Sequence, residues 1–286
     1  MKFVEQFYVK MPVADLEAMN PKTAVAIAGS AFDFIQRRKP GAPKIRIVAP
    51  DDKALGYRNR HTVVELLNDD IPFLIDSLSA ELTRHGFTVY ETLHPVFRVA
   101  RDKKGELASL ASEEDKKGGG VVESLIHFEI SGLPEGLSAE QLTSDLEWVL
   151  SHIRVSVEDW RPIVARVQEN VARLARLKAG FAREDVSEVA DFLQWLIDRN
   201  FIFLGYAEYD VRGARGEEEL VALAGSKLGI LKIADELTAR GMESAAPEAR
   251  NFLHTPHLIE ITKSNRRSPV HRSVPMDYIA LKRFDG

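Results

Sequence analysis

The stretch that most constrains the fold runs from residue 61 to residue 86, HTVVELLNDDIPFLIDSLSAELTRHG. Residues 62–67 are β-branched and apolar apart from Glu65, which predicts a strand with unequally buried faces. After an acidic turn, four apolar residues recur at helical spacing and predict an amphipathic helix that Gly86 ends in the left-handed conformation. They are Leu74, Ile75, Leu78 and Leu82. Such a unit lays its helix on a sheet and puts the turn at the rim of that sheet.

The acidic turn has two interpretations. In the first, Asp69 or Asp70 caps the helix and Pro72 lies in its first turn. In the second, free backbone amides at the helix start bind the carboxylate of an amino acid, and the acidic side chains bind its ammonium group. The residues of this candidate effector site are Asn68, Asp69, Asp70, Ile71 and Pro72.

The rest of the chain alternates between helical and strand patterns. Helices are expected over residues 12–38 with a cap at Asn20, from a cap at Ser138 to a break near Trp160 caused by Pro162, over 163–178, and from a cap at Ser187. Strands are expected over residues 44–50 as an edge, 89–99 with a bulge or edge position at Pro95, 123–130 with one buried face, 201–211, 258–263 and 278–284. Residues 112–120 are expected to form a loop.

The length of 286 residues predicts about two domains. We expect an N-terminal helical segment over residues 1–43, an α+β domain over 44–160, a helical connector over 161–199 and a second α/β domain over 200–286. The last strand has no following partner, so the second domain is expected to be incomplete.

Composition excludes several classes of function. A net charge of −5 gives no basic footprint for nucleic acid. The chain has no cysteine, which excludes disulfides, thiol nucleophiles and thiolate metal ligands. It also has no apolar run long enough for a membrane span and no signal peptide, so we expect a cytoplasmic protein without a membrane partner.

Catalytic motifs are missing from the sequence. Neither a dinucleotide-binding glycine pattern, a P-loop, a zinc-protease motif nor a nucleophile elbow is present, and we expect no catalytic residue and no metal site; His254 and His257 lack a third ligand nearby. A basic run near the C-terminus is expected to be a solvated loop or an anion or interface contact through Arg266, Arg267 and Arg272.

Residues 63–89, VVELLNDDIPFLIDSLSAELTRHGFTV, resemble the start of an ACT domain. Together with RKPGAPKIRIVAP, LHPVFRVARDKKGEL, ESLIHFEISGL, FLQWLIDRNFIFLGYAEYDV and KSNRRSPVHRSVPMDYIALKRFDG, they resemble the N-terminal, non-catalytic region of the large bacterial NAD-specific glutamate dehydrogenases. The resemblance implies an ACT-like (ferredoxin-like) antiparallel sheet with helices on one face and an N-terminal helix packed on it. Two departures are Phe73, where the ACT pattern commonly has glycine, and a second helix that is not followed by the usual strand. The strand over residues 44–50 is expected to supply the missing edge.

The resemblance also implies a function. The full-length parent would oxidise L-glutamate to 2-oxoglutarate and ammonium with NAD, while this segment would need no cofactor of its own. Its expected partners are the remainder of the dehydrogenase chain, further copies in a homo-oligomer and an amino-acid effector. Regulation and oligomerisation are the first hypothesis, a purely structural scaffold is the second, and an independent enzyme is disfavoured by the missing motifs.

Overall fold

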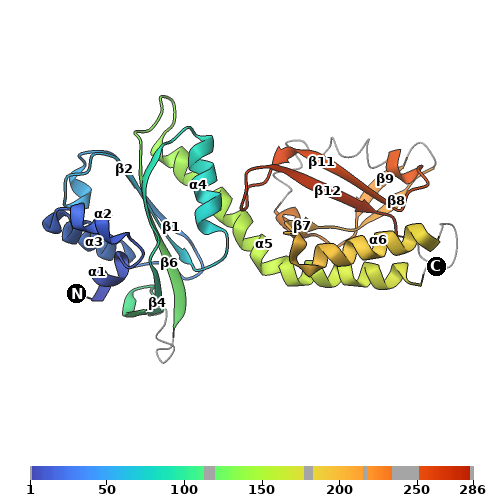
Figure 1. Ribbon diagram of the computed structural model, residues 1–286, viewed down its shortest axis with the longest axis horizontal. Helices are drawn as coiled ribbons and strands as arrows, with labels where there is room; N and C mark the ends of the chain where they lie inside the picture. The colour runs from blue at the N-terminus through green and yellow to red at the C-terminus, as the bar shows by residue number, and fades with distance from the viewer. Residues whose placement is uncertain (1, 113–119, 177–182, 215–217, 234–250, 284–286) are drawn as a thin grey trace. The chain divides into compact units, whose positions relative to one another are not determined.

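The computed structural model describes residues 2–112, 120–176, 183–214, 218–233 and 251–283 (Figure 1). The chain divides into two compact units, Met1–Leu150 and Ser151–Gly286. This division does not test the four predicted segments, which stay predictions. Among the described residues, none of the helices combines the length and the apolar character that a membrane span requires.

The first unit is built on an antiparallel sheet of six strands, in the order β1-β2-β6-β4-β5, with β3 also paired to β6. The strands are β1 (Lys44–Val48), β2 (Thr62–Asp69), β3 (Val89–Leu93), β4 (Val96–Arg101), β5 (Leu107–Ser112) and β6 (Val121–Ile130). The predicted α+β class and the predicted edge strand β1 are confirmed. Strand β5 was not predicted. The expected loop over residues 112–120 lies mostly outside the described residues.

Helices cover both faces of this sheet (Figure 1). On one side lie α1 (Lys2–Phe7), α2 (Val13–Ala18) and α3 (Pro21–Ile35); on the other lie α4 (Leu74–Arg84) and the start of α5 (Ala139–Leu174). The predicted caps are confirmed for α3 and α5, since Asn20 accepts from the amides of Lys22 and Thr23 and Ser138 accepts from the amide of Gln141. Gly86, just beyond α4, has a φ of 82° as expected.

Strands β2 and β6 form the centre of the unit. Their register pairs Thr62 with Ile130 and Asp69 with Glu123. The prediction of one buried face in β6 is incomplete, because Leu125 to Phe128 are all buried on alternating sides. The second face is buried by the N-terminal helices, whose apolar residues pack on Leu67, Phe97 and Leu125.

Helix α5 is one continuous helix of 36 residues, so the predicted break near Trp160 is wrong. Pro162 lies inside it and removes one backbone donor. The apolar stripe continues through that position, and Ile163 and Val167 are buried. Burial of this stripe therefore outweighs the local preference to end the helix.

The second unit places helices against short strands. Besides the end of α5 it contains α6 (Arg183–Trp195), a π-helical turn (Leu196–Asn200), β7 (Gly205–Tyr206), β8 (Tyr209–Arg212), β9 (Glu219–Ala222), β10 (Leu228–Gly229), a 3-10 turn (Ile230–Lys232), β11 (Ile259–Arg267) and β12 (Pro275–Leu281). A core that includes Ile163, Leu193 and Leu258 joins the helices to the strands. The predicted cap at Ser187 is wrong because α6 begins four residues earlier, and the predicted strand over residues 201–211 is reduced to β7 and β8.

Candidate functional site

The turn between β2 and α4 differs from the predicted cap. Strand β2 continues through Asp69, and the amide of Asp70 still donates to the carbonyl of Val122 at 3.0 Å. Helix α4 begins only at Leu74, after Phe73 in the left-handed conformation with φ 72°. The prediction that an aspartate caps this helix and that Pro72 lies in its first turn is therefore wrong. Both aspartates are instead held by residues far away in the sequence.

Asp69 forms an ion pair on the sheet face that α3 covers. Its Oδ1 accepts from the guanidinium of Arg38 at 2.8 Å, and the Arg38 side chain is only 1% exposed. The neighbouring Asn68 is buried, and its amide group donates to the backbone carbonyl of Asp69 at 3.0 Å. The carboxylate of Asp69 is thus committed to the protein interior.

Asp70 is joined to a histidine through a buried serine. The hydroxyl of Ser124 donates to Oδ1 of Asp70 at 2.6 Å, and Nε2 of His94 lies 3.0 Å from the same hydroxyl oxygen. Because the hydroxyl proton goes to Asp70, Nε2 of His94 carries the proton of the second bond. Burial, aided by the charge of Lys10, lowers the pKa of His94, which favours the neutral ring.

His94 faces a small hollow at the start of α4. The hollow measures about 230 Å³ and is lined by Ile71, Pro72, Phe73, Leu74, Ile75, Asp76 and His94. The amide of Ser77 donates to the carbonyl of Phe73 at 3.1 Å. The first amides of a helix generally have no acceptor within it. The hollow is smaller than the roughly 300–1,000 Å³ of sites for drug-sized ligands.

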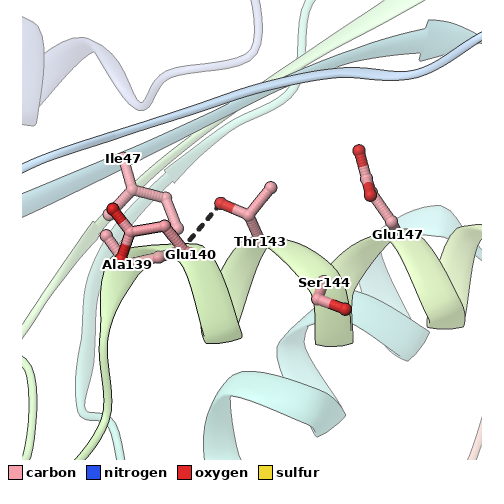
Figure 2. Close-up of a pocket in the computed structure, with 6 residues that line it drawn as sticks. All are labelled: Ile47, Ala139, Glu140, Thr143, Ser144 and Glu147. Atoms are coloured by element: carbon pink, nitrogen blue, oxygen red, sulfur yellow. Dashed lines mark hydrogen bonds between the residues drawn. The ribbon is translucent and has the colours of Figure 1, made fainter.

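A second hollow of about 360 Å³ lies along the start of α5, away from this turn. Figure 2 shows its lining residues on one side of the helix together with Ile47 of β1. Thr143 is engaged by its own helix, since its hydroxyl donates to the carbonyl of Ala139 at 2.8 Å. The carboxylates of Glu140 and Glu147 point away from each other (Figure 2), so they do not form a common binding point. We therefore place the candidate site at the turn.

Behind the turn lies a buried cluster of charges that sequence analysis missed. Glu123 of β6 accepts from Arg38 at 2.8 Å and from Arg101 at 2.7 Å and 2.8 Å. The side chains of Arg38, Arg101 and Glu123 are 1%, 5% and 2% exposed. With Asp69, two guanidinium groups meet two carboxylates, so the cluster is neutral. A signal was present in the sequence, because Glu123 lies in a strand that is rich in β-branched and other apolar residues.

A second buried group of charges lies farther along the same two strands. Nδ1 of His127 is 3.0 Å from Oε1 of Glu65, and Arg46 also binds Glu65. Burial lowers the pKa of His127, but the carboxylates of Glu129 and Glu65 outweigh it and raise the value to about 9. Burial raises the pKa of Glu65, yet His127 and Arg46 hold it below its usual value. The raised pKa favours the protonated, positively charged form of the His127 ring.

The three arginines of the second candidate site are not gathered by the fold. Arg266 and Arg267 are successive residues of β11, so their side chains leave on opposite faces. Nη1 of Arg267 donates to the carbonyl of Ser273, and Arg272 lies between the two strands. Of the two histidines considered as ligands, His254 contacts Glu218 at 3.1 Å.

Comparison with known proteins places this chain. A family model described as "Glutamate dehydrogenase, ACT1 domain" matches residues 3–146. The chain is 33% identical over 285 residues to the NAD-specific glutamate dehydrogenase of Halomonas elongata and 30% identical over 284 residues to that of Pseudomonas aeruginosa, in each case across 99% of this chain and 18% of the relative. An NAD-specific glutamate dehydrogenase of Mycobacterium tuberculosis is 25% identical over 182 residues, 63% of this chain and 11% of the relative.

Two conclusions follow from these matches. The chain spans less than a fifth of the length of the curated relatives it matches. The ACT-like sheet expected from the sequence is confirmed, and the matched range covers nearly all of the first unit. By the family model and by its similarity across almost its whole length, the chain belongs to the glutamate dehydrogenase family and carries its ACT1 domain.

Proposed function

We propose that this chain is the N-terminal regulatory and oligomerisation segment of an NAD-dependent glutamate dehydrogenase. The parent would convert L-glutamate and NAD to 2-oxoglutarate, ammonium and NADH at a site outside this chain. The segment would hold no cofactor of its own and would work with the remainder of the dehydrogenase and with further copies of itself. The names of the relatives and the ACT1 match support this assignment.

The observation that carries a regulatory role is the chain of contacts from the hollow to the centre of the sheet. His94 lines the hollow, contacts Ser124 of β6, and through that hydroxyl is joined to Asp70. An amino acid in the hollow would place its carboxylate near the first amides of α4. Its ammonium group would lie near the acidic turn. Binding would then act on β6, which pairs with β2, β3 and β4.

The engagement of the two aspartates favours the alternative of a scaffold without a small-molecule site. Asp69 is paired with Arg38, and Asp70 accepts from Ser124, so neither carboxylate is uncommitted. Phe73 also borders the hollow where a glycine would leave more space. In this alternative the first unit builds the oligomer through its sheet or its helices and the hollow has no ligand.

Thermal unfolding of the chain against a panel of free amino acids tests the effector site. At about 100 times the dissociation constant, a ligand of the folded state stabilises by about 2.7 kcal/mol. We expect one amino acid to raise the unfolding temperature, and His94→Ala to abolish the rise. Arg58→Ala is the matched control, because the Arg58 side chain is exposed and forms an ion pair with the also exposed Asp51, away from the hollow.

Sedimentation of the same chain separates the two functions. If no amino acid shifts the unfolding temperature and the chain sediments as a defined oligomer, an effector site in this chain is excluded. The scaffold would then be the remaining function. A shift that survives in His94→Ala would place the ligand elsewhere. Allostery further requires that the ligand change a property of the parent, so NAD reduction by the full-length enzyme is to be measured with and without the active amino acid.

A further inference from the structure

Helices α4 and α5 bring three metal-ligating side chains together on the first unit. They are Glu81 and His85 of α4 and its cap, and Asp145 of α5. One ligand atom from each lies within 4.8 Å of the other two. Glu81 is buried and the side chains of His85 and Asp145 are 14% and 24% exposed, so the cluster is reachable from solvent but is not a loose surface group.

The distances within the cluster fit the first shell of a small metal ion. Nε2 of His85 lies 3.2 Å from Oε1 of Glu81 and 3.0 Å from Oδ2 of Asp145. Bonds of 2.0–2.1 Å to a tetrahedral zinc ion separate neighbouring ligand atoms by about 3.3 Å. The helical spacing of Glu81 and His85, four residues apart, puts both on one face of the helix. Little movement is thus needed to bind an ion.

The positively charged guanidinium of Arg84 already contacts this cluster. The guanidinium of Arg84 binds Glu81, with Nε 2.8 Å from Oε2, and its Nη2 lies 3.0 Å from Nε2 of His85. The Arg84 side chain is 55% exposed, so it can turn outward into water. Glu81 and His85 therefore already bind a positive charge, and that charge is on a side chain that can move away.

The other side of the cluster is oriented by a neighbour on α5. The amide group of Gln141 donates to Oδ1 of Asp145 at 2.9 Å, which leaves Oδ2 directed at His85. Hydrogen bonds of this kind fix ligating carboxylates in metal sites. An imidazole nitrogen together with two carboxylate oxygens suits zinc better than magnesium or calcium, which prefer oxygen alone.

We propose that Glu81, His85 and Asp145 form a zinc site in which Zn²⁺ replaces the guanidinium of Arg84. Two carboxylates and a neutral imidazole balance the charge of the ion, and water completes its coordination. The ion would join α4 to α5 across the helical layer of the sheet. The site is separate from the hollow lined by His94, so its test does not depend on the effector proposal.

Calorimetric titration of residues 1–286 with zinc chloride tests the site in a buffer that does not chelate. We expect one ion per chain, with affinity lowered at least tenfold in Asp145→Asn and in His85→Gln. Arg84→Gln is expected to bind zinc more tightly, because it removes the competing cation. Glu147→Gln is the matched control. Glu147 lies on α5 outside the cluster, so this variant should bind zinc as tightly as the unsubstituted chain.

Each variant is first unfolded thermally in the presence of a chelator, so that loss of folding is distinguished from loss of ligands. Magnesium chloride should not compete with zinc. The proposal would be overturned if the unsubstituted chain binds no zinc, or if only Arg84→Gln binds it, because Arg84 would then keep the ion out. Binding that His85→Gln leaves unchanged would place the ion at other histidines and would overturn it equally.

Discussion

The two faces of the central strands β2 and β6 are both buried, but only one of them carries buried charges. By the alternation of the strands, the face without charges carries Val64, Leu66, Ile126, Phe128 and Ile130, together with the buried hydroxyl of Ser124. Toward α1, α2 and α3, the same strands carry the charged residues Glu65, Glu123, His127 and Glu129, of which the first three are almost fully buried.

The difference shows how one strand can serve two layers. An apolar face is stabilised by any close-packed apolar cover. A charged face is stable only if each charge has its partner, because an unpaired buried charge is costly. The N-terminal helical segment supplies part of these partners, as Arg38 follows α3 and binds both Glu123 and Asp69. Its role is therefore electrostatic as well as hydrophobic.

The largest expected effect is on the apolar face. Phe128→Ala should lower the free energy of unfolding by about 3–5 kcal/mol, because the ring is fully buried and leaves a cavity. Urea unfolding measures the change. Val121→Ala on the same strand is the control and should cost little, since Val121 is 55% exposed. A similar loss in both variants would contradict the assignment of the buried face.

On the charged face, Glu123→Gln should cost about 3 kcal/mol, the lower end for a broken buried ion pair, because the amide oxygen can still accept a hydrogen bond. The control is Glu106→Gln, whose partner Arg37 is 69% exposed and whose loss should cost less than about 1 kcal/mol. Equal effects at Glu123 and Glu106 would show that burial of the cluster does not matter to stability.

The pH dependence of stability distinguishes the two faces. The raised pKa of His127, about 9, stabilises the protein fully below the ordinary histidine value near 6.5, and this contribution is lost as pH rises through 9. Integrated over that window, the loss is on the order of 3 kcal/mol. The lowered pKa of Glu65 acts oppositely, since its contribution is present above the ordinary glutamate value and is lost on acidification.

Urea unfolding at pH 6, 7.5 and 9.5 measures the histidine contribution. We expect the free energy of unfolding to depend less on pH in His127→Gln than in the unsubstituted chain. Phe128→Ala should lower it equally at each pH. If the free energy of unfolding changes equally with pH in the unsubstituted chain and in His127→Gln, the ring is not a buried cation.

The smallest expected effect lies at the turn that connects β2 to α4. Phe73 has a φ of 72°, which costs a residue with a side chain about 1–2 kcal/mol. Phe73→Gly removes this strain but also the half-buried ring, and the two effects oppose each other, so stability should change by no more than about 1 kcal/mol. Phe73→Val should be the more destabilising of the two, because a β-branched residue tolerates this conformation poorly. The reverse order would contradict the left-handed turn.

Local patterns predicted the parts of the fold that depend on neighbours in sequence. The apolar stripe of α4, the left-handed Gly86 and the edge strand β1 follow from spacing and residue type alone. The hydrogen bond of Asp70 could not be predicted in this way. Its partner Ser124 lies on a different strand and is brought near Asp70 only by the β2–β6 register. The same holds for Arg38, whose two acidic partners come from two strands.

The effector site at the turn stays a prediction, and only part of its predicted residue set lines the hollow. Residues 68–72 do border the hollow through Ile71 and Pro72. His94, which joins the hollow to β6, was not among the predicted site residues, because its partner Ser124 lies 30 residues further along the chain. Glu65 indicated unequally buried faces, and residues 123–130 were predicted to bury one face only, so the covered second face was missed.

The register of the two central strands has a consequence for the order of folding during synthesis. Strand β2 leaves the ribosome with β1, its neighbour on one edge, but its other neighbour β6 ends only at Ile130. Until that residue is made, one edge of a largely apolar strand stays unpaired and open to other chains. The same late pairing closes a long loop, which slows folding. The nascent first unit is therefore most vulnerable to aggregation just before β6 is complete.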